Sequence, residues 1–380
     1  MNWDQDLAAN DVSLGIDGNA TRTVCFDNKI PAFVEAAIER CYGSLFATLP
    51  HLRHTGKLTA TTSTYVQYVD GKVRALLLFD QHDRQITVLN ELIQLSKQEI
   101  AAFVAFVFAR YVTIAAVSFN AVRADLTGLD HPVQRYFCSE DIVVSSLVNL
   151  NDYTERLKKS TRKSIRRHGN ALLRAHPAAT FNILSAPDID DALVRKIIGF
   201  NKARMANKDR VSAYTVEESR WITALASTRG MAMIVTIDEQ VCAGAVCCQV
   251  GNSFFMLVAA HDPAYDQFGM GMLCSYRAVC ACIARDATAV HFLWGRLAYK
   301  TSLGGTPQRF DRITVYRNRM AYLRHLKQAM FAAVNGLMRE MRLYLLNAEG
   351  EPTARGRIAD LVWRWARRLK RAVGSVSWRS

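Results

Sequence analysis

Hydrophobic residues change their spacing several times between residues 253 and 300, and each spacing indicates one structural element. Residues 254–260 form an uninterrupted apolar run of strand length, which is entered and left through turn-like polar sequences. Apolar residues then recur at steps of three and four over 272–283, which is the pattern of one helix face. A second apolar run covers 290–294. The pattern predicts a strand, a loop, a helix and a second strand.

Two glycines, Gly269 and Gly271, stand where this helix is expected to begin. The first backbone N–H groups of a helix have no partner within the helix, and the helix dipole is positive at that end. Because the glycines put no side chains in the way, these groups could bind an anion such as a pyrophosphate. A simple crossover, in which the glycines only allow close packing, explains the same residues equally well.

The order of predicted elements in the first half of the chain matches the order in the second half. Each half has a hairpin with an aspartate in its turn, at Asp70 and at Asp238. Each hairpin is followed by a further strand, which begins at Ile86 in the first half and at Phe254 in the second. Both pairs of positions are 168 residues apart, which is consistent with two copies of one unit.

A strongly basic helix is predicted between the two halves. Residues 156–175 contain eight lysines and arginines and no acid, and Asn151 or Asp152 could cap the helix. Such a helix suits an anionic partner, for which the phosphates of a CoA-type ligand, an acidic or lipid-linked glycan, tRNA and a membrane face are candidates. The alternative is a solvated helix whose charges simply face water.

The end of the chain is predicted to be helical. A long helical pattern covers 320–346, and residues 355–373 combine one apolar stripe with many arginines and two boundary tryptophans. This composition is typical of an interfacial membrane anchor, although a terminal helix packed on its own domain explains it as well. The net charge of +14 is concentrated in the basic helix and in residues 353–380, which favours specific anionic contacts over general basic solubility.

One other stretch is apolar enough to be considered as a membrane-spanning segment. Residues 100–119 are nearly all apolar and about long enough to span a bilayer, but Arg110 lies at their centre. A charge there costs about 2.5–3.5 kcal/mol on insertion scales. We therefore expect a buried helix from Ser96 to about Arg110, with Ser96 and Glu99 as a capping box, followed by a buried strand over 112–119.

Composition indicates a globular protein. With 380 residues, half of them hydrophobic, the chain can bury a substantial core and is expected to form two domains. The nine cysteines show no metal-binding spacing, so we expect reduced thiols and no metal. An acidic N-terminus with no apolar run behind it argues against a secretory signal. The expected location is the cytoplasm, with the terminal stretch 355–373 as a candidate contact to the anionic inner membrane.

Together these motifs resemble the GNAT superfamily of acyl-CoA-dependent N-acyltransferases, in particular its CelD-like branch, also called BioF2-like acetyltransferases. The resemblance is carried by the arginine-rich helix 156–174, by Gly269-Met270-Gly271, and by the G-x-x-x-Y-K element 295–300. It covers about residues 145–320. Two residues depart from the pattern, because Asp266 replaces the usual glutamine or arginine before the first glycine, and His291 replaces an acidic residue. A carboxylate at 266 would repel a pyrophosphate.

The resemblance, which extends to the FemAB peptidyltransferases, implies an α/β fold of two tandem GNAT-like domains with a C-terminal helical extension. The implied division is 20–150 for a degenerate domain, 151–318 for the acyl-CoA-binding domain, and 319–380 for the extension. Because the first copy has no glycine turn around 92–95, we expect it to shape an acceptor cleft without holding cofactor.

Candidate site residues follow from the resemblance and from their positions. Tyr299 stands where many GNAT enzymes hold the tyrosine that protonates the leaving thiolate, while His261 and Asp262 end a strand where a base would be useful. A surface tyrosine, a satisfied histidine and a plain turn are the structural alternatives. The resemblance implies that acetyl-CoA or another acyl-CoA contacts Gly269, Met270, Gly271, Met272, Arg296 and Lys300. Contacts to the acceptor or to an anion are expected from Arg162, Arg166, Arg167 and Arg204.

The sequence therefore predicts an acyltransferase of class EC 2.3.1. It would carry out N-acetyl or N-acyl transfer to an amine or hydroxyl of an envelope- or polysaccharide-related acceptor. One alternative is a FemAB-like transferase that takes an aminoacyl group from charged tRNA, for which the basic helix is suited. Another is a non-catalytic accessory protein that binds an anionic membrane or a polyanion.

Overall fold

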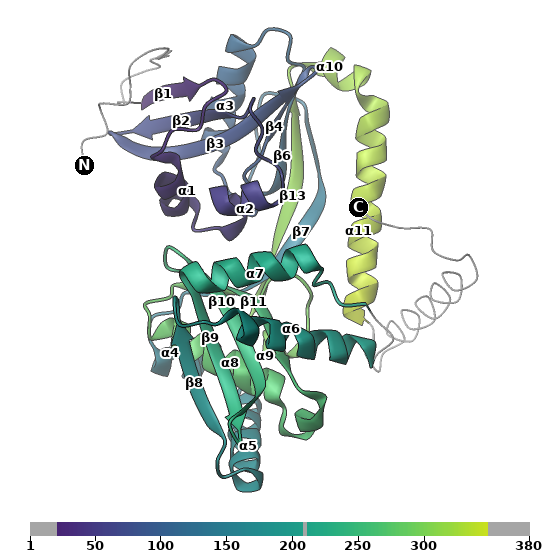
Figure 1. The fold of residues 1–380 in the computed structure, drawn as a ribbon. Coiled ribbons are helices and arrows are strands. Elements are labelled where there is room, and N and C mark those ends of the chain that lie inside the picture. The colour runs from purple at the N-terminus through teal and green to yellow at the C-terminus, as the bar shows by residue number, and fades with distance from the viewer. Residues whose placement is uncertain (1–20, 208–210, 349–380) are drawn as a thin grey trace.

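The computed structural model describes residues 21–207 and 211–348, which fold around one mixed sheet flanked by helices (Figure 1). The strands follow the spatial order β1-β2-β3-β4-β6-β13-β7-β12-β11-β10-β9-β8, and β5 pairs with β6. The strands are β1 Thr21–Phe26, β2 Ser63–Val69, β3 Lys72–His82, β4 Gln85–Val88, β5 Ile93–Gln94, β6 Ala116–Arg123, β7 Val133–Ser145, β8 Thr180–Ser185, β9 Gly230–Ile237, β10 Gln240–Val250, β11 Ser253–His261, β12 Ala289–His291 and β13 Thr306–Tyr316. The α-helices are α1 Val34–Tyr42, α2 Leu49–His54, α3 Lys97–Arg110, α4 Leu150–Arg156, α5 Lys159–Ala175, α6 Asp191–Ala206, α7 Val216–Arg229, α8 Met270–Ile283, α9 Ala298–Ser302, α10 Arg319–Arg324 and α11 Leu326–Ala348, and the 3-10 helices are η2 Leu45–Ala47 and η3 Pro263–Phe268.

The two halves of the chain exchange strands in the middle of the sheet. β7 comes from the first half and pairs with β12 of the second half. β13 ends the second half and lies between β7 and β6 of the first half. Accordingly, Ile313 and Val315 of β13 are buried in the apolar core of the first half. The predicted boundaries at 150 and 318 stay a prediction, because the exchanged strands join the two halves in one sheet.

The predicted repeat of one structural unit is present in the fold. The hairpins β2–β3 and β9–β10 turn at Asp70 and Asp238, and both aspartates are left-handed, with φ of 51° and 47°. A parallel strand pair follows each hairpin, β4 with β6 in the first half and β11 with β12 in the second. The prediction of two tandem α/β units is therefore confirmed.

The apolar stretch 100–119 is a buried helix and strand. Ser96 and Glu99 form the predicted capping box at the start of α3, with Glu99 N–H donating to Ser96 Oγ at 3.2 Å and Ser96 N–H to Glu99 Oε2 at 2.7 Å. Arg110 ends the helix and forms an ion pair with Asp27. The strand was predicted from residue 112 but begins at Ala116, because Tyr111 and the exposed residues after it form a turn. Within the two described ranges, no helix is long and apolar enough to cross a bilayer.

The basic helix differs from the prediction in its boundaries. It is broken into α4 and α5 at Leu157, which is extended and buried in the core of the second half. The cap of α4 is Asn149, whose side chain accepts from Asp152 N–H at 2.9 Å, and neither predicted cap residue takes this role. The helical pattern 320–346 corresponds to α10 and α11, and the predicted anchor 355–373 lies outside the described residues.

Candidate active site

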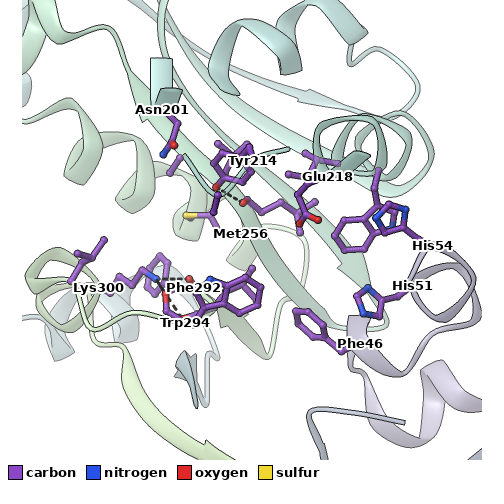
Figure 2. Close-up of a pocket in the computed structure, with 18 of the residues that line it drawn as sticks. Phe46, His51, His54, Asn201, Tyr214, Glu218, Met256, Phe292, Trp294 and Lys300 are labelled. Carbon is purple, nitrogen blue, oxygen red and sulfur yellow. Dashed lines mark hydrogen bonds between the residues drawn. The ribbon is translucent and has the colours of Figure 1, made fainter. Parts of the chain in front are cut away.

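The sheet opens between β11 and β12. These parallel strands pair only along Ser253–Phe255, opposite Ala289–His291. β12 ends at His291, so the rest of β11 does not pair with it, and a cavity of about 410 Å³ is lined by this part of β11 (Figure 2). Its walls come from η2 and α2 of the first half and from α6, α7, β11 and α9 of the second half. The cavity is therefore built by both halves of the chain.

Aromatic rings line the end of the cavity that the first half contributes. His54 stacks on Trp221 of α7, with ring centroids 5.1 Å apart and ring planes at 12°. His51 meets the same indole edge-on at 5.1 Å, and Phe46 contacts the His51 ring at 5.0 Å. Phe46 also lies 6.1 Å from the ring of Trp294, and Figure 2 shows this group of rings at the opposite end from Lys300.

Tyr299 lines the cavity at the end formed by the second half. Its ring packs edge-on against Phe292, with centroids 6.2 Å apart. Burial raises the pKa of Tyr299, and the nearby Arg204 opposes this shift only in part. Arg204 also lines the cavity, and its Nε is buried without a hydrogen-bond partner in the described part of the chain. A neutral phenol and an unpaired guanidinium N–H therefore lie beside the open edge of β11.

Glu218 is the one acidic residue among the described residues that line the cavity. It lies in the first turn of α7, where its backbone N–H donates to Thr215 Oγ1 at 3.1 Å. Burial raises the pKa of Glu218, and the nearby His54 acts in the opposite direction. A carboxyl group with a raised pKa can exchange a proton more readily near neutral pH.

The glycine turn is at the C-terminal end of β11, beside helix α5. Gly269 precedes α8 in a left-handed conformation with φ of 59°. A Cβ atom at Gly269 would lie 2.6 Å from Nδ1 of His168, so a larger residue would force a shift. A Cβ atom at Gly271 would lie 3.7 Å from the ring of His261. The two histidines therefore flank the first N–H groups of α8.

His261 and Asp262 support this turn and do not line the cavity that holds Tyr299. His261 is 9% exposed, and its Nε2 lies 2.7 Å from Oδ1 of Asp266. Its Nδ1 is buried and has no partner among the residues that the structure describes. Asp262 accepts from Ala264 N–H at 3.0 Å and thereby caps η3. The unusual Asp266 is thus hydrogen-bonded to a histidine, and only the protonated form of His261 would offset the charge of this carboxylate at the turn.

Lys300 is buried, and its ammonium group binds backbone carbonyls of the protein. It is 5% exposed, and its Nζ donates to the carbonyls of Phe292 and Trp294, each at 2.7 Å. Burial lowers the pKa of Lys300 from 10.5 to about 8, while Asp141 and Glu140 oppose the shift. Its side chain therefore links α9, which carries Tyr299, to the segment that connects β12 with α9.

The predicted contact residue Arg296 is also engaged within the protein. Its Nε and Nη2 lie 3.0 and 2.8 Å from Oε2 of Glu140, whose side chain is 3% exposed. Beside this pair, Nδ1 of His291 lies 2.6 Å from Oδ2 of Asp141. The histidine that replaces the family's acidic residue thus pairs with an acid supplied by β7.

The arginines predicted to bind an anion are divided between two places. Arg162, Arg166 and Arg167 are exposed on α5, and none of them lines the cavity. α5 packs on η3 and α8, so these arginines lie on the helix that borders the glycine turn. Arg204 alone of the four lies in the cavity.

Several cavity residues had no signal in the sequence. Phe46, His51 and His54 occur in short elements of the first half, and Glu218 is one of many acids at helix starts. Trp221 differs from them, because its four-residue spacing from Leu225 in the sequence indicates one inward face of a helix. The pairing of two histidines with a tryptophan far away along the chain could not be read from local patterns.

Comparison with known proteins supports this description. Residues 159–301 match the family model described as "Acetyltransferase (GNAT) domain". This part of the chain is therefore similar to a GNAT-type acetyltransferase domain. It contains the glycine turn, the open edge of β11 and Tyr299. The finer assignment to the CelD-like branch stays a prediction. No curated protein matches the chain.

Two solved structures share most of the fold. The crystal structure of FemX superposes with a TM-score of 0.55 at 11% identity, covering 78% of this chain and 98% of FemX. A conserved protein of unknown function from Bacteroides thetaiotaomicron VPI-5482 superposes with a TM-score of 0.51 at 12% identity, covering 77% of this chain and 99% of that one. At such low identity, these similarities establish the fold.

Proposed function

We propose that the protein is an acyltransferase of class EC 2.3.1, which transfers an acyl group from acetyl-CoA or a longer acyl-CoA to an amine or hydroxyl of an envelope- or polysaccharide-related acceptor. The observation that carries this proposal is the position of Tyr299, a partly buried tyrosine that lines the cavity beside the open edge of β11, within the residues that match a GNAT domain model. An acyl transferase of this type needs an acid for its leaving thiolate, and Tyr299 is placed to supply it.

The residues around the glycine turn fit a CoA diphosphate. The N–H groups of Met272 and Leu273 already donate to the carbonyl of Gly269, so those of Met270 and Gly271 are the ones at this helix start that a diphosphate could bind. Because Nε2 of His261 is paired with Asp266, the buried Nδ1 can donate to a phosphate oxygen only when the imidazole carries both protons. The exposed arginines of α5 supply positive charge beside the turn. Between the turn and the cavity, the open edge of β11 can pair with an extended arm of the ligand.

Two of the residues that line the cavity, Tyr299 and Arg204, can act on a proton or on a charge. Bound acyl-CoA supplies an activated acyl group as a thioester. A tyrosine hydroxyl is protonated at neutral pH, and burial raises the pKa of Tyr299 further, so Tyr299 is in the acid form that can protonate the departing sulfur. The unpaired Nε–H of Arg204 can donate to the negative charge that develops on the carbonyl oxygen.

A thiol-release assay tests this function. We expect the purified protein to release free CoA from acetyl-CoA or a longer acyl-CoA only when an acceptor with an amine or hydroxyl is present. Mass spectrometry of the acceptor should show the added acyl mass. If acyl-CoA binds but no acceptor in a broad panel is modified, the non-catalytic alternative is favoured instead.

A second candidate function is transfer from aminoacyl-tRNA, and the exposed cations of α5 favour it. Arg162, Lys163, Arg166 and Arg167 all face solvent on one helix, as a polyanion-binding surface requires. The salt dependence of binding distinguishes aminoacyl-tRNA from acyl-CoA as the donor. Binding of tRNA should weaken steeply with salt, since each phosphate contact releases counterions, whereas binding of CoA should weaken far less.

We also propose that the protein contacts an anionic membrane, on the observation of an unusual apolar face on α11. This helix packs on β7 (Figure 1). Seven large apolar side chains on one side of α11 are exposed to solvent. The members of this α11 face are Met330, Phe331, Val334, Leu337, Met338, Met341 and Tyr344, each at least half exposed. Arg339 and Arg342 are exposed beside them. An apolar face with flanking cations suits the boundary of anionic lipid headgroups.

Vesicle sedimentation of the full chain tests this contact. Phe331 and Met338 are 71% and 54% exposed, and burying such side chains in the acyl boundary contributes about 1.5–3 kcal/mol each. We expect the double variant Phe331→Asp and Met338→Asp to bind phosphatidylglycerol vesicles at least tenfold more weakly than the wild type.

The matched control for the α11 face places two acids elsewhere on the surface. The control carries Val112→Asp in the turn before β6 and Leu173→Asp on α5, both at exposed apolar residues. It should bind vesicles like the wild type. Equal binding by the Phe331/Met338 variant would contradict the proposal. The proposal would also be contradicted if the wild type formed a dimer in solution and the Phe331/Met338 variant, but not the control, were monomeric. The α11 face would then be a protein interface.

A further inference from the structure

Three residues that line the cavity each carry a buried polar atom that has no hydrogen-bond partner among the described residues. These atoms are Nδ1 of His51, Nε1 of Trp221 and Nε of Arg204. Burial lowers the pKa of His51 to about 4, with Lys57 and His54 adding to the effect, so its ring is neutral at physiological pH. An unpaired buried polar group is costly, and such groups usually await a ligand or water. The cavity thus offers separate donors and a ring nitrogen to a ligand with several polar groups.

Aromatic rings also form part of the cavity wall. Trp294 lines the cavity and is 55% exposed, so a large part of its indole is free to contact a ligand. Phe46 lies next to it, with ring centroids 6.1 Å apart. Indole faces favour flat apolar surfaces, and they also attract cations. Glu218 faces the same space as a half-buried carboxylate (Figure 2).

We propose that the acceptor is an amino sugar, bound with one C–H face of its ring on Trp294 and with its amine on the Glu218 carboxylate. This inference rests on the acyltransferase function proposed above and specifies its acceptor. A sugar ring combines an apolar C–H face with a rim of hydroxyl groups. The rim would pair with Trp221 Nε1 and His51 Nδ1, which a flexible alkylamine such as a lysine side chain would leave unsatisfied.

The same geometry assigns the proton transfers. Glu218 takes one proton from the sugar ammonium, and the neutral amine then attacks the thioester carbonyl. The N–C bond forms as the C–S bond breaks, Tyr299 gives its proton to the thiolate, and the nitrogen returns a proton to Tyr299. The products are the N-acyl sugar, free CoA thiol and a protonated Glu218, which releases its proton to water. No further reactant is required.

Saturation-transfer NMR and acyl transfer assays test the proposal with three probes. D-glucosamine has the ring and the amine, D-glucose has only the ring, and lysine amide has only the amine. We expect magnetisation transfer to the ring protons of glucosamine and, more weakly, of glucose. We expect N-acylation of glucosamine with a kcat/KM at least 100-fold above that of lysine amide.

Glu218→Gln and Glu217→Gln form a matched pair of variants. Both remove one negative charge from adjacent residues, but only Glu218 lines the cavity. Glu218→Gln should lower kcat/KM for glucosamine about 100-fold or more, whereas Glu217→Gln should stay within twofold of the wild type. Calorimetry should show unchanged acyl-CoA binding by both variants, which separates a lost acceptor contact from a lost donor site.

Two results would overturn the amino-sugar assignment. One is a preference for lysine amide over glucosamine in the transfer assay. The other is an unchanged glucosamine reaction in Glu218→Gln. A failure of the wild type to bind acyl-CoA is a different result, because it removes the proposed acyltransferase function while the NMR titration still reports whether the cavity binds the sugar.

Discussion

Replacing Tyr299 with phenylalanine should lower kcat by about 10²–10⁴-fold, which is the usual contribution of a positioned acid. The change removes only the hydroxyl group that would protonate the leaving thiolate. The ring stays edge-on to Phe292, so the walls of the cavity and the affinity for acyl-CoA should be preserved. Steady-state kinetics together with calorimetric titration of acyl-CoA would separate the two effects.

A second tyrosine gives the control for this prediction. Tyr322 of α10 packs against Tyr316 and lies far from the cavity lining, so Tyr322→Phe should retain wild-type kcat. A Tyr299→Phe variant with wild-type kcat would show that water or another residue protonates the thiolate. Weaker acyl-CoA binding with unchanged kcat would show that the hydroxyl acts in binding instead.

Replacing Lys300 with methionine should lower the free energy of unfolding by about 3 kcal/mol. The variant leaves the carbonyls of Phe292 and Trp294 without their donor inside the protein. It also removes a cation from the neighbourhood of the buried Asp141 and Glu140. Urea denaturation would measure the loss, and Lys163→Met on the exposed face of α5 should change the free energy of unfolding by less than about 0.5 kcal/mol.

The pH dependence of the difference in unfolding free energy between the wild type and Lys300→Met gives a second test. The pKa of Lys300 is about 8 in the folded protein, below the 10.5 of an exposed lysine. The unfolded chain therefore binds this proton more tightly, and stability rises with pH between the two values. The stabilisation from neutral Lys300 is complete above pH 10.5 and is lost as the pH falls through 8. A stability difference between wild type and Lys300→Met that stays flat over this range would contradict the assignment.

Local patterns were sufficient to predict the elements around the glycine turn. The change from a continuous apolar run to a three- and four-residue period marks the end of β11 and the start of α8. Ser96 and Glu99 marked the start of α3 for the same reason, since a helix cap depends on residues three apart. The repeated aspartate turns indicated the tandem fold, because both turns need a residue that tolerates a positive φ.

Features that depend on long-range contacts were not predictable. The position of β13 between β6 and β7 follows from pairing across the whole chain, and no local period encodes it. Lys300 was expected at a phosphate, because its sequence context does not show that three carbonyls surround its ammonium. His261 ends its strand as expected, yet the strand carries it to the glycine turn instead of the cavity. The ring-lined end of the cavity exists only because two distant segments meet.

Calorimetric titration of the intact protein with acetyl-CoA and a longer acyl-CoA tests the central claim most directly. Gly271→Trp should fill the space between the first turn of α8 and His261 and abolish binding. Gly199→Trp, at a helical glycine whose Cβ would meet open space, should bind like the wild type. The account predicts micromolar affinity that only Gly271→Trp loses, with the fold of each protein confirmed by circular dichroism. No binding by the correctly folded wild type, or equal binding by Gly271→Trp, would contradict it.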